Sequence, residues 1–134
     1  IIKIMIRDKI KGTIAHILSM ATYSGMPFLT AYSASKAALA ITIKNVANAI
    51  SGHQIRVNGV NADKIQSGLL TKEMIALRAK ARGIKEVDYL KNNLLNKEVT
   101  AADVAESFYV QLFLNKTTAN IITVDGGNIE ASLR

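Results

Sequence analysis

Residues 19–36 read SMATYSGMPFLTAYSASK, and the interpretation of the whole chain starts from this stretch. It begins with Ser19 at the end of an apolar run, passes through a loop with the chain's only proline, and ends in a predicted helix. Tyr32 and Lys36 are four positions apart, a spacing that places two side chains on one face of a helix. The stretch therefore predicts a strand end and a helix start that lie close together.

A phenol beside an ammonium group is able to carry out proton transfer. The fixed positive charge of Lys36 favours the phenolate form of Tyr32, which then exchanges a proton with an alcohol or carbonyl oxygen near neutral pH. Ser19 lies thirteen positions before Tyr32, and a strand end facing a helix start would bring its hydroxyl to the same oxygen. The alternative is an ordinary solvated Tyr–Lys pair and a serine in a turn. Spacing alone leaves both interpretations open.

Composition limits the class of protein. The chain has 134 residues, is 49% hydrophobic and contains no cysteine, which suits one modest domain in a reducing cytoplasm without disulfide or thiolate metal sites. No apolar run reaches the length of a membrane span, so we expect no membrane partner. The net charge of +7 raises the alternative of a nucleic-acid-binding module. The basic residues are scattered, however, and we interpret them as a solvated surface.

Hydrophobic periodicity predicts alternating helices and strands in the first half of the chain. The expected elements are the tail of an amphipathic helix over 1–11, a strand over 13–19 that is apolar on both faces, a helix over 30–50 closed by Gly52, and a strand over 54–60. A strand, a helix and a second strand in this order form a parallel sheet. The loop after the second strand then lies where ligands of open α/β sheets bind.

The second half continues the same alternation. The expected elements are a helix over 70–82 that stops at Gly83, a short helix over 87–92, a helix over 100–114 with a capping-box start, and a strand over 119–124. The last strand is followed by Asp125-Gly126-Gly127, in which the glycines permit a tight turn.

These features together resemble the short-chain dehydrogenase/reductase family. The matching residues are Ser19, the YxxxK pair Tyr32 and Lys36 with small residues behind it, the RVN of the second strand, and the DGG after the last strand. The resemblance implies an α/β fold: the carboxy-terminal half of a Rossmann-like doubly wound parallel sheet in three layers, with the amino-terminal strands missing. We therefore expect residues 1–134 to be a single partial domain, the carboxy-terminal piece of a longer protein.

The resemblance also implies roles for individual residues. Tyr32 would be the general acid/base, Lys36 would assist it and hold the nicotinamide ribose, and Ser19 would hydrogen-bond the reacting oxygen. The implied cofactor is NAD or NADP, and the implied partner is a small-molecule carbonyl or alcohol substrate rather than nucleic acid. Homo-oligomerisation through the small-faced helix of Tyr32 is a further expectation. His16 replaces the family's usual asparagine, and we interpret it, like His53, as structural.

One loop departs from the family pattern. After the RVN strand the family commonly has proline and glycine, then an apolar residue and a threonine; here those positions are Ala62, Asp63, Ile65 and Ser67. Ile65 would pack beside the nicotinamide and Ser67 keeps a hydroxyl, so both are expected in the cofactor site. A carboxylate at Asp63 beside cofactor phosphate would be unfavourable unless it points elsewhere. This loop favours a non-catalytic scaffold as the alternative function.

A narrower resemblance comes from the segments ADKIQSGLL, NNLL, VTAADVAE, KTTANIITVDGG and EASLR. They are similar to the dehydrogenase half of bifunctional rhamnulose-phosphate aldolase/lactaldehyde dehydrogenase proteins. A small hydroxyaldehyde or a sugar-derived compound is then a candidate substrate. The chain contains no glycine-rich dinucleotide fingerprint, so we expect it to bind cofactor poorly and to be inactive on its own.

Overall fold

The computed structural model describes residues 1–24 and 29–128 of the chain. Pro27 and the ending at 130–134, which contributed to the sequence interpretation, lie outside the described residues. In chain order the elements are α1 (Ile2–Arg7), β1 (Gly12–Ile17), the 3-10 helix η1 (Met20–Thr22), α2 (Thr30–Ala49), β2 (Ile55–Ala62), α3 (Lys72–Ala81), α4 (Glu86–Tyr89), α5 (Ala101–Gln111) and β3 (Ile121–Val124).

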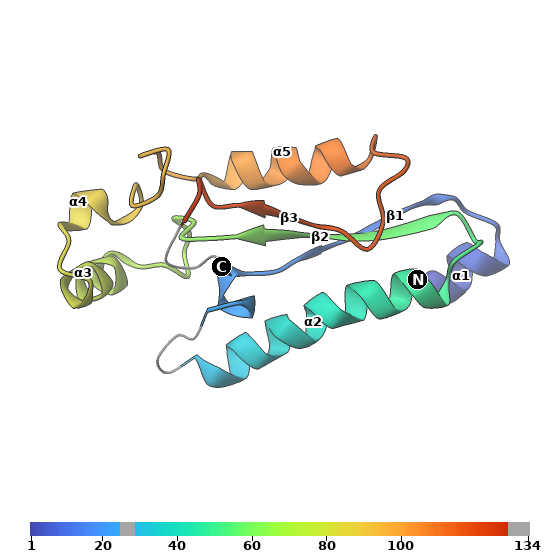
Figure 1. Cartoon of the computed structure of the whole chain (residues 1–134), viewed down its shortest axis with the longest axis horizontal. Coiled ribbons are helices and arrows are strands. Elements are labelled where there is room, and N and C mark those ends of the chain that lie inside the picture. Colours follow the sequence, from blue (N-terminus) through green and yellow to red (C-terminus); the bar gives the residue numbers. More distant parts are fainter. Residues whose placement is uncertain (25–28, 129–134) are drawn as a thin grey trace.

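The three strands form one parallel sheet in the order β1-β2-β3. Ile14 pairs with Val57 between the first two strands, and Val60 pairs with Ile122 between the second two. Helix α2 lies on one face of the sheet with α1 beside its end, and α5 lies on the other face (Figure 1). This arrangement confirms the predicted three-layer α/β fold with a parallel sheet.

The main apolar core lies between α2 and the sheet. Ala40 and Ile43, three positions apart on α2, meet Val57 of β2 and Leu18 just after β1. Gly59 of β2 lies directly beneath them, because an added Cβ there would be 2.5 Å from Leu18 Cδ1 and 2.8 Å from Ile43 Cδ1. A side chain at position 59 would require these two terminal methyl groups to shift, so its absence favours the close approach of helix and strand.

Helix α5 covers the opposite face of the sheet. Its Val104 packs with Val60 of β2 and with Val99 in a second apolar cluster. The helix begins with a capping box, in which the Thr100 hydroxyl accepts from the Asp103 amide and the Asp103 carboxylate accepts from the Thr100 amide. A hydrogen bond from the Thr100 hydroxyl, followed by the backbone bond from Thr100, lowers the pKa of the Asp103 carboxyl. The capping-box prediction for this helix is thus confirmed.

The carboxyl end of α5 is held by Arg56 of β2. Its guanidinium donates to the backbone carbonyl oxygens of Gln111 at 2.6 Å, Leu112 at 2.9 Å and Leu114 at 3.0 Å. Carbonyls in the last turn of a helix lack intrahelical partners and carry partial negative charge, so a cation stabilises them. Arg56 therefore fixes α5 on the sheet.

The structure corrects the predicted first strand. β1 ends at Ile17, and Ser19 instead caps η1, because its hydroxyl accepts from the Ala21 amide at 3.2 Å. The strand is also not buried on both faces: Ala15 and Ile17 are exposed. Within the described residues β1 has β2 as its only neighbouring strand, and this leaves its other edge uncovered.

The other predicted elements are present with shifted ends. Gly52 and Gly83 follow α2 and α3 with φ angles of +92° and +66°, as expected for glycines that end helices. Helix α3 begins after Thr71, whose hydroxyl accepts from the Met74 amide at 3.3 Å. β2 continues two residues beyond its predicted end, to Ala62.

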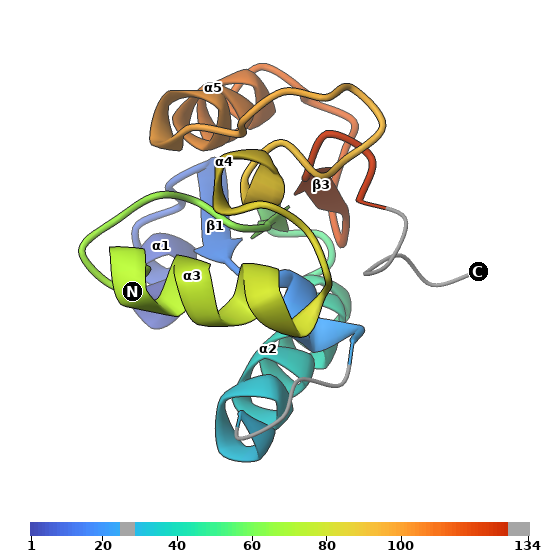
Figure 2. The same cartoon turned by 90° about the vertical axis from the view of Figure 1, so that its left-hand side faces the viewer.

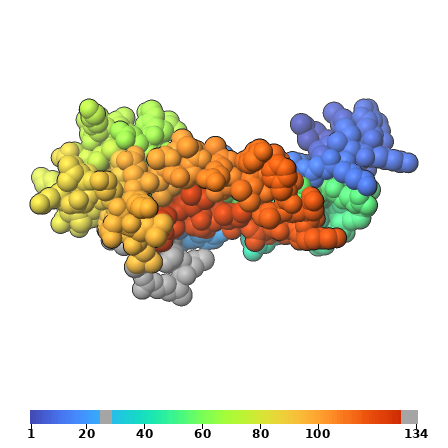
Figure 3. Space-filling model, turned by 90° about the horizontal axis from the view of Figure 1, so that it is seen from above, coloured from blue at the N-terminus to red at the C-terminus, as the bar shows by residue number. Residues whose placement is uncertain are grey.

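Helices α3 and α4 form a separate group, which we call the α3–α4 unit (residues 70–90). It has its own apolar cluster of Leu70, Ile75, Ala79 and Tyr89. The unit lies beyond the carboxyl ends of β2 and β3 (Figures 1 and 2). In the space-filling view it forms one end of the molecule and α1 the other, with α5 between them (Figure 3).

Candidate active site

Tyr32 and Lys36 lie on the same stripe of α2 as the core residues. A helix turns once every 3.6 residues, so positions 32, 36, 43 and 47 all point to nearly the same side. Ile43 and Ala47 of this stripe are buried against the sheet. Nearer the start of the helix the stripe reaches the carboxyl end of β1, where Lys36 meets the last residue of that strand. The sheet contact of α2 thus directs Tyr32 and Lys36 to the carboxyl edge of the sheet.

The ammonium group of Lys36 makes two contacts at this edge. Its Nζ donates to the carbonyl oxygen of Ile17, the last residue of β1, at 3.0 Å. The same Nζ lies 5.7 Å from the centroid of the Tyr32 ring. The structure therefore brings together the cation and the phenol that the four-residue spacing predicted, and it anchors the cation to the sheet.

Tyr32 and Ser19 are both accessible at this edge. The Tyr32 side chain is 44% exposed, which leaves it open to a small molecule. Ser19 is half-buried two residues after Ile17, and its hydroxyl accepts the η1 capping bond from Ala21. Among the hydrogen bonds of the described residues, none joins Ser19 to Tyr32. Their convergence on one substrate oxygen stays a prediction.

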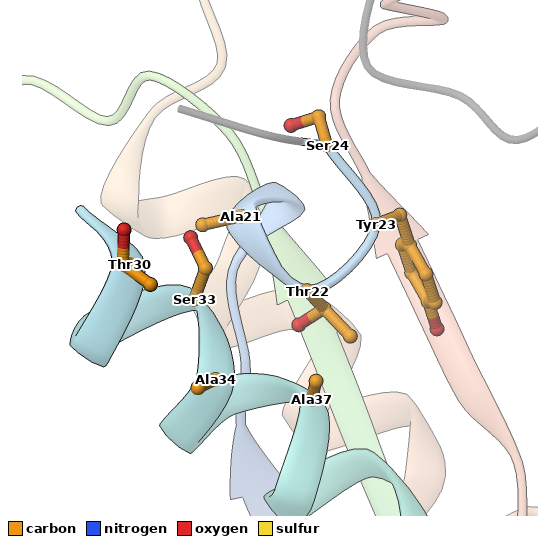
Figure 4. Close-up of a pocket in the computed structure, with 8 residues that line it drawn as sticks. All are labelled: Ala21, Thr22, Tyr23, Ser24, Thr30, Ser33, Ala34 and Ala37. Carbon is orange, nitrogen blue, oxygen red and sulfur yellow. The ribbon is translucent and has the colours of Figure 1, made fainter. Parts of the chain in front are cut away.

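A separate cavity of about 410 Å³ lies between η1 and the start of α2 (Figure 4). The hydroxyl oxygens of Thr22 and Ser33 on its walls are buried and without hydrogen-bond partners among the described residues. Ala34 and Ala37, part of the small helix face seen in the sequence, also line it. Tyr32 and Lys36 are not among its lining residues, so this cavity is distinct from the predicted catalytic edge.

The unusual loop after β2 turns its acid inward. The Asp63 side chain is buried, accepts a hydrogen bond from the Asn128 amide, and lies 3.6 Å from the ammonium of Lys64. Its charge is thus balanced within the protein. Ile65 packs beside the Val60 cluster, and Ser67 is exposed and accepts from the Leu69 amide at 3.3 Å. The roles of Ile65 and Ser67 toward a cofactor stay predictions.

Two further polar side chains at the sheet were not singled out from the sequence. Asn58, the asparagine of RVN, donates to the Thr117 carbonyl at 3.0 Å and accepts from the Asn120 amide at 3.1 Å, which fixes the approach to β3. The buried amide of Asn61 donates to the sulfur of Met20, while its oxygen has no partner within the described residues. The RVN motif could have identified Asn58 from the sequence, whereas no sequence motif marks Asn61.

The profile of the short chain dehydrogenase family matches residues 1–78, more than half of the chain. The chain belongs to the short-chain dehydrogenase family. The match includes the elements that carry Ser19, Tyr32, Lys36 and the RVN strand. The family resemblance predicted from these residues is confirmed.

Two curated proteins are similar to this chain over most of its length. Carbonyl reductase (NADPH) 2 of Sus scrofa is 30% identical over 128 residues, which is 92% of this chain and 49% of that protein. L-xylulose reductase of Caenorhabditis elegans is 29% identical over 127 residues, 89% of this chain and 46% of that protein. The chain thus spans about half the length of the curated relatives it matches.

Two solved structures superpose well on the chain. A 4-hydroxyisoleucine dehydrogenase complexed with NADH gives a TM-score of 0.80 at 28% identity, covering 95% of this chain and 51% of that one. A short-chain dehydrogenase family protein from Francisella tularensis gives 0.76 at 27% identity, covering 95% and 55%. The match supports the arrangement of sheet, α2 and α5 described above.

Metal-binding clusters and membrane-spanning helices are absent from the part of the chain that the structure describes. Within residues 1–24 and 29–128, no group of three or more histidine, aspartate or glutamate side chains is placed to hold a metal ion. In the same part of the chain, no helix combines the length and apolar character needed to cross a membrane.

Proposed function

We propose that this chain carries the proton-transfer half of the active site of an NAD(P)-dependent oxidoreductase. The reaction would interconvert a carbonyl compound and the corresponding alcohol. The names of similar proteins support this class, since they include a carbonyl reductase, an L-xylulose reductase and a dehydrogenase complexed with NADH. The observation that carries the proposal is the Lys36 ammonium, held between the carbonyl of Ile17 and the ring of Tyr32.

Each of the three side chains has a distinct task in this proposal. Tyr32 donates its phenolic proton to the carbonyl oxygen during reduction and takes it back during oxidation. Lys36 supplies a fixed positive charge beside Tyr32, which stabilises the phenolate left after donation. Ser19 donates its hydroxyl proton in a hydrogen bond to the reacting oxygen, while its oxygen still accepts the bond from the Ala21 amide. A bound nicotinamide dinucleotide would supply or accept the hydride.

The residues at the carboxyl edge fit such a dinucleotide. An ammonium has three N–H donors, and the described bond to Ile17 uses one, so Lys36 keeps donors for ribose hydroxyls. Asp63 does not oppose an anionic ligand, because Asn128 and Lys64 already pair with its carboxylate. Ile65 and Ser67 follow at the same edge, beyond the end of β2. We propose that this loop borders the nicotinamide end of the cofactor.

The finer features also remain proposals. The segments around ADKIQSGLL and VTAADVAE favour a small hydroxyaldehyde or sugar-derived substrate, by likeness to the lactaldehyde dehydrogenase half of bifunctional proteins. Association of two copies through α2 would cover Ala31, Ala34 and Ala38, which are exposed in this chain. We propose a cytoplasmic location, which the cysteine-free composition favours.

The test is hydride transfer by the full-length protein that contains this chain. NADH and NADPH oxidation at 340 nm would be followed with a panel of small aldehydes, ketones and hydroxyaldehydes. We expect Tyr32→Phe to lower kcat/KM by about 10²–10⁴-fold, the usual value of a positioned acid/base. Tyr109→Phe is the matched control, since Tyr109 is also exposed but lies on α5, and it should retain activity. Equal activity of Tyr32→Phe and wild type would exclude this proposal.

The isolated chain offers a second test. It contains no glycine-rich dinucleotide fingerprint, so we expect calorimetric titration with NADH or NADPH to show no binding in the micromolar range. Micromolar affinity of the isolated chain would contradict the division of the active site into two halves. Salt-dependent binding to DNA, without hydride transfer by the full-length protein, would favour the nucleic-acid-binding alternative.

A further inference from the structure

In the described part of the chain, the helices of the α3–α4 unit have few contacts with the strands of the sheet. Its buried side chains, Leu70, Ile75, Ala79 and Tyr89, form a cluster distinct from the two clusters on the sheet. Within the described residues, α3 makes its main contacts with α4, and neither helix packs extensively on a strand. Contacts made by the segments that connect the unit to β2 and β3 are therefore candidates for setting its position.

Lys64, two residues after β2, has an unusual conformation for a lysine. Its φ angle is +46°, in the left-handed region that side-chain-bearing residues seldom adopt. Its side chain is only 6% exposed, although burial of an ammonium is unfavourable without compensating partners. A left-handed backbone and a buried charge at one residue are both unfavourable, so contacts with the surrounding residues must stabilise Lys64 in this position.

The partners of Lys64 come from both sides of the connection. Its Nζ donates to the carbonyl oxygen of Asn92, just after α4, at 2.9 Å. The same Nζ lies 5.6 Å from the centroid of the Tyr89 ring, at the centre of the unit's cluster. On the sheet side it lies 3.6 Å from the carboxylate of Asp63. One ammonium thus joins the end of β2 to the interior of the α3–α4 unit.

The Asp63 carboxylate extends this connection to the segment after β3. The side-chain amide of Asn128 donates to the same carboxylate oxygen that faces Lys64. Nearby, the amides of Leu94 and Leu95 donate to the carbonyls of Gly127 and Gly126 at 3.2 and 3.1 Å. The chain after α4 is therefore bound to the turn after β3, next to the Asp63–Lys64 pair.

We propose that Lys64 is a positioning residue that holds the α3–α4 unit over the carboxyl edge of the sheet. The start of α2, which carries Tyr32 and Lys36, lies at this same end of the molecule (Figure 1). Through Asn92 and Tyr89 the ammonium sets where the unit lies relative to that edge, and Asp63 with Asn128 holds the ammonium. A role of the unit in covering substrate is the part of this proposal that rests on the proposed function.

The test compares hydrogen exchange in wild type and Lys64→Met, both in the full-length protein. Methionine keeps much of the apolar stem but cannot donate to Asn92. We expect amides of residues 72–92 to exchange at least about tenfold faster in the variant, and amides of β2 to be unchanged. Lys80→Met, an exposed lysine on α3, is the matched control and should match wild type. Unchanged exchange in residues 72–92, or equal acceleration in β2, would overturn the proposal.

A double variant separates positioning from simple loss of charge balance. Lys64→Met leaves the buried Asp63 carboxylate without its cation, and Asp63→Asn removes that carboxylate charge. If Lys64 positions the unit, the double variant Lys64→Met/Asp63→Asn still shows fast exchange in residues 72–92. Recovery of wild-type protection in the double variant would show that the orphaned carboxylate caused the effect, which contradicts the proposal.

Two readouts keep this result independent of the proposed function. In wild type, native-state exchange should show residues 72–92 opening as a group at lower free energy than β2; a shared opening would contradict the proposal without any variant. In an active protein, Lys64→Met should raise KM for the carbonyl substrate about tenfold with a smaller change in kcat. If wild type transfers no hydride, the proposed function fails while the exchange result still decides the role of Lys64.

Discussion

The α2–sheet body and the α3–α4 unit are built differently within one short chain. In the body, β2 pairs along its length with β1 and β3, and α2 packs directly on it, as at Gly59. In the unit, two short helices enclose one small apolar cluster, and the link to the sheet passes through loop residues such as Lys64. The residues proposed for proton transfer lie on the first region, and the unit that Lys64 is proposed to position is the second.

Under the proposed function, this difference would suit two tasks that need different stiffness. A proton-transfer group must stay within hydrogen-bond reach of the reacting oxygen, which favours a helix fixed by core packing. A cover must open for substrate and product, which favours an element with few bonds to its surroundings. Lys36, bound to Ile17 of β1, belongs to the α2–sheet body, and Lys64, bound to Asn92, belongs to the connection between the body and the α3–α4 unit.

The largest effect on stability is expected from Ile43→Ala in the α2–sheet body. Ile43 is fully buried between α2 and the sheet, and such truncations usually cost about 2–5 kcal/mol of unfolding free energy. Denaturant unfolding of the full-length protein would measure it. Ile41→Ala on the same helix is the control, because Ile41 is 56% exposed and should change stability by no more than about 0.5 kcal/mol. Similar losses from both variants would contradict the packing of α2.

A smaller and more local effect is expected from Ile75→Ala in the α3–α4 unit. Ile75 is buried in the unit's own cluster, so its loss should destabilise residues 72–92 and leave the sheet intact. We expect a cost near the lower end of the range for such truncations, about 2 kcal/mol, because the small cluster can partly collapse. Hydrogen exchange resolved by segment would detect it. Loss of protection throughout β2 would show instead that the two regions unfold together.

The smallest effect is a pH dependence at the start of α5. The hydrogen bond with the Thr100 hydroxyl lowers the pKa of Asp103. This cap therefore stabilises the fold at pH values above the ordinary carboxyl pKa of 3.8. The contribution is lost as pH falls through the lowered value. We therefore expect Asp103→Asn to melt below wild type at pH 7, with a difference that shrinks below about pH 4. Glu106→Gln, an exposed acid on the same helix, serves as control; the same pH-dependent gap there would refute this assignment.

Local sequence signals predicted most of the fold. The helix of Tyr32 was expected over 30–50 and spans Thr30–Ala49, because its apolar stripe and Gly52 define both ends. The predicted end of β1 was wrong. The Ser19 hydroxyl accepts a hydrogen bond from the Ala21 amide and starts a 3-10 turn, so the strand does not continue to this residue. A short polar side chain can always compete in this way with a strand ladder, and periodicity does not reveal which one prevails.

The candidate site likewise contains one contact that the sequence predicts and others that it does not. The contact of Tyr32 with Lys36 follows from helix geometry, which acts over four residues and can be read directly. The pairing of Asp63 with Lys64 and Asn128 cannot, since Asn128 is distant in sequence and the left-handed backbone of Lys64 has no glycine to mark it. Long-range polar contacts of this kind depend on the completed fold.

The narrow space at Gly59 has a consequence for related sequences. A single added carbon would meet the terminal methyl groups of Leu18 and Ile43, and both would have to shift to make room for it. A homologue with a larger residue at 59 should carry compensating reductions at 18 and 43, or hold its tyrosine helix farther from the sheet. Covariation among these three positions would therefore report how far the helix of Tyr32 and the sheet are separated in each protein.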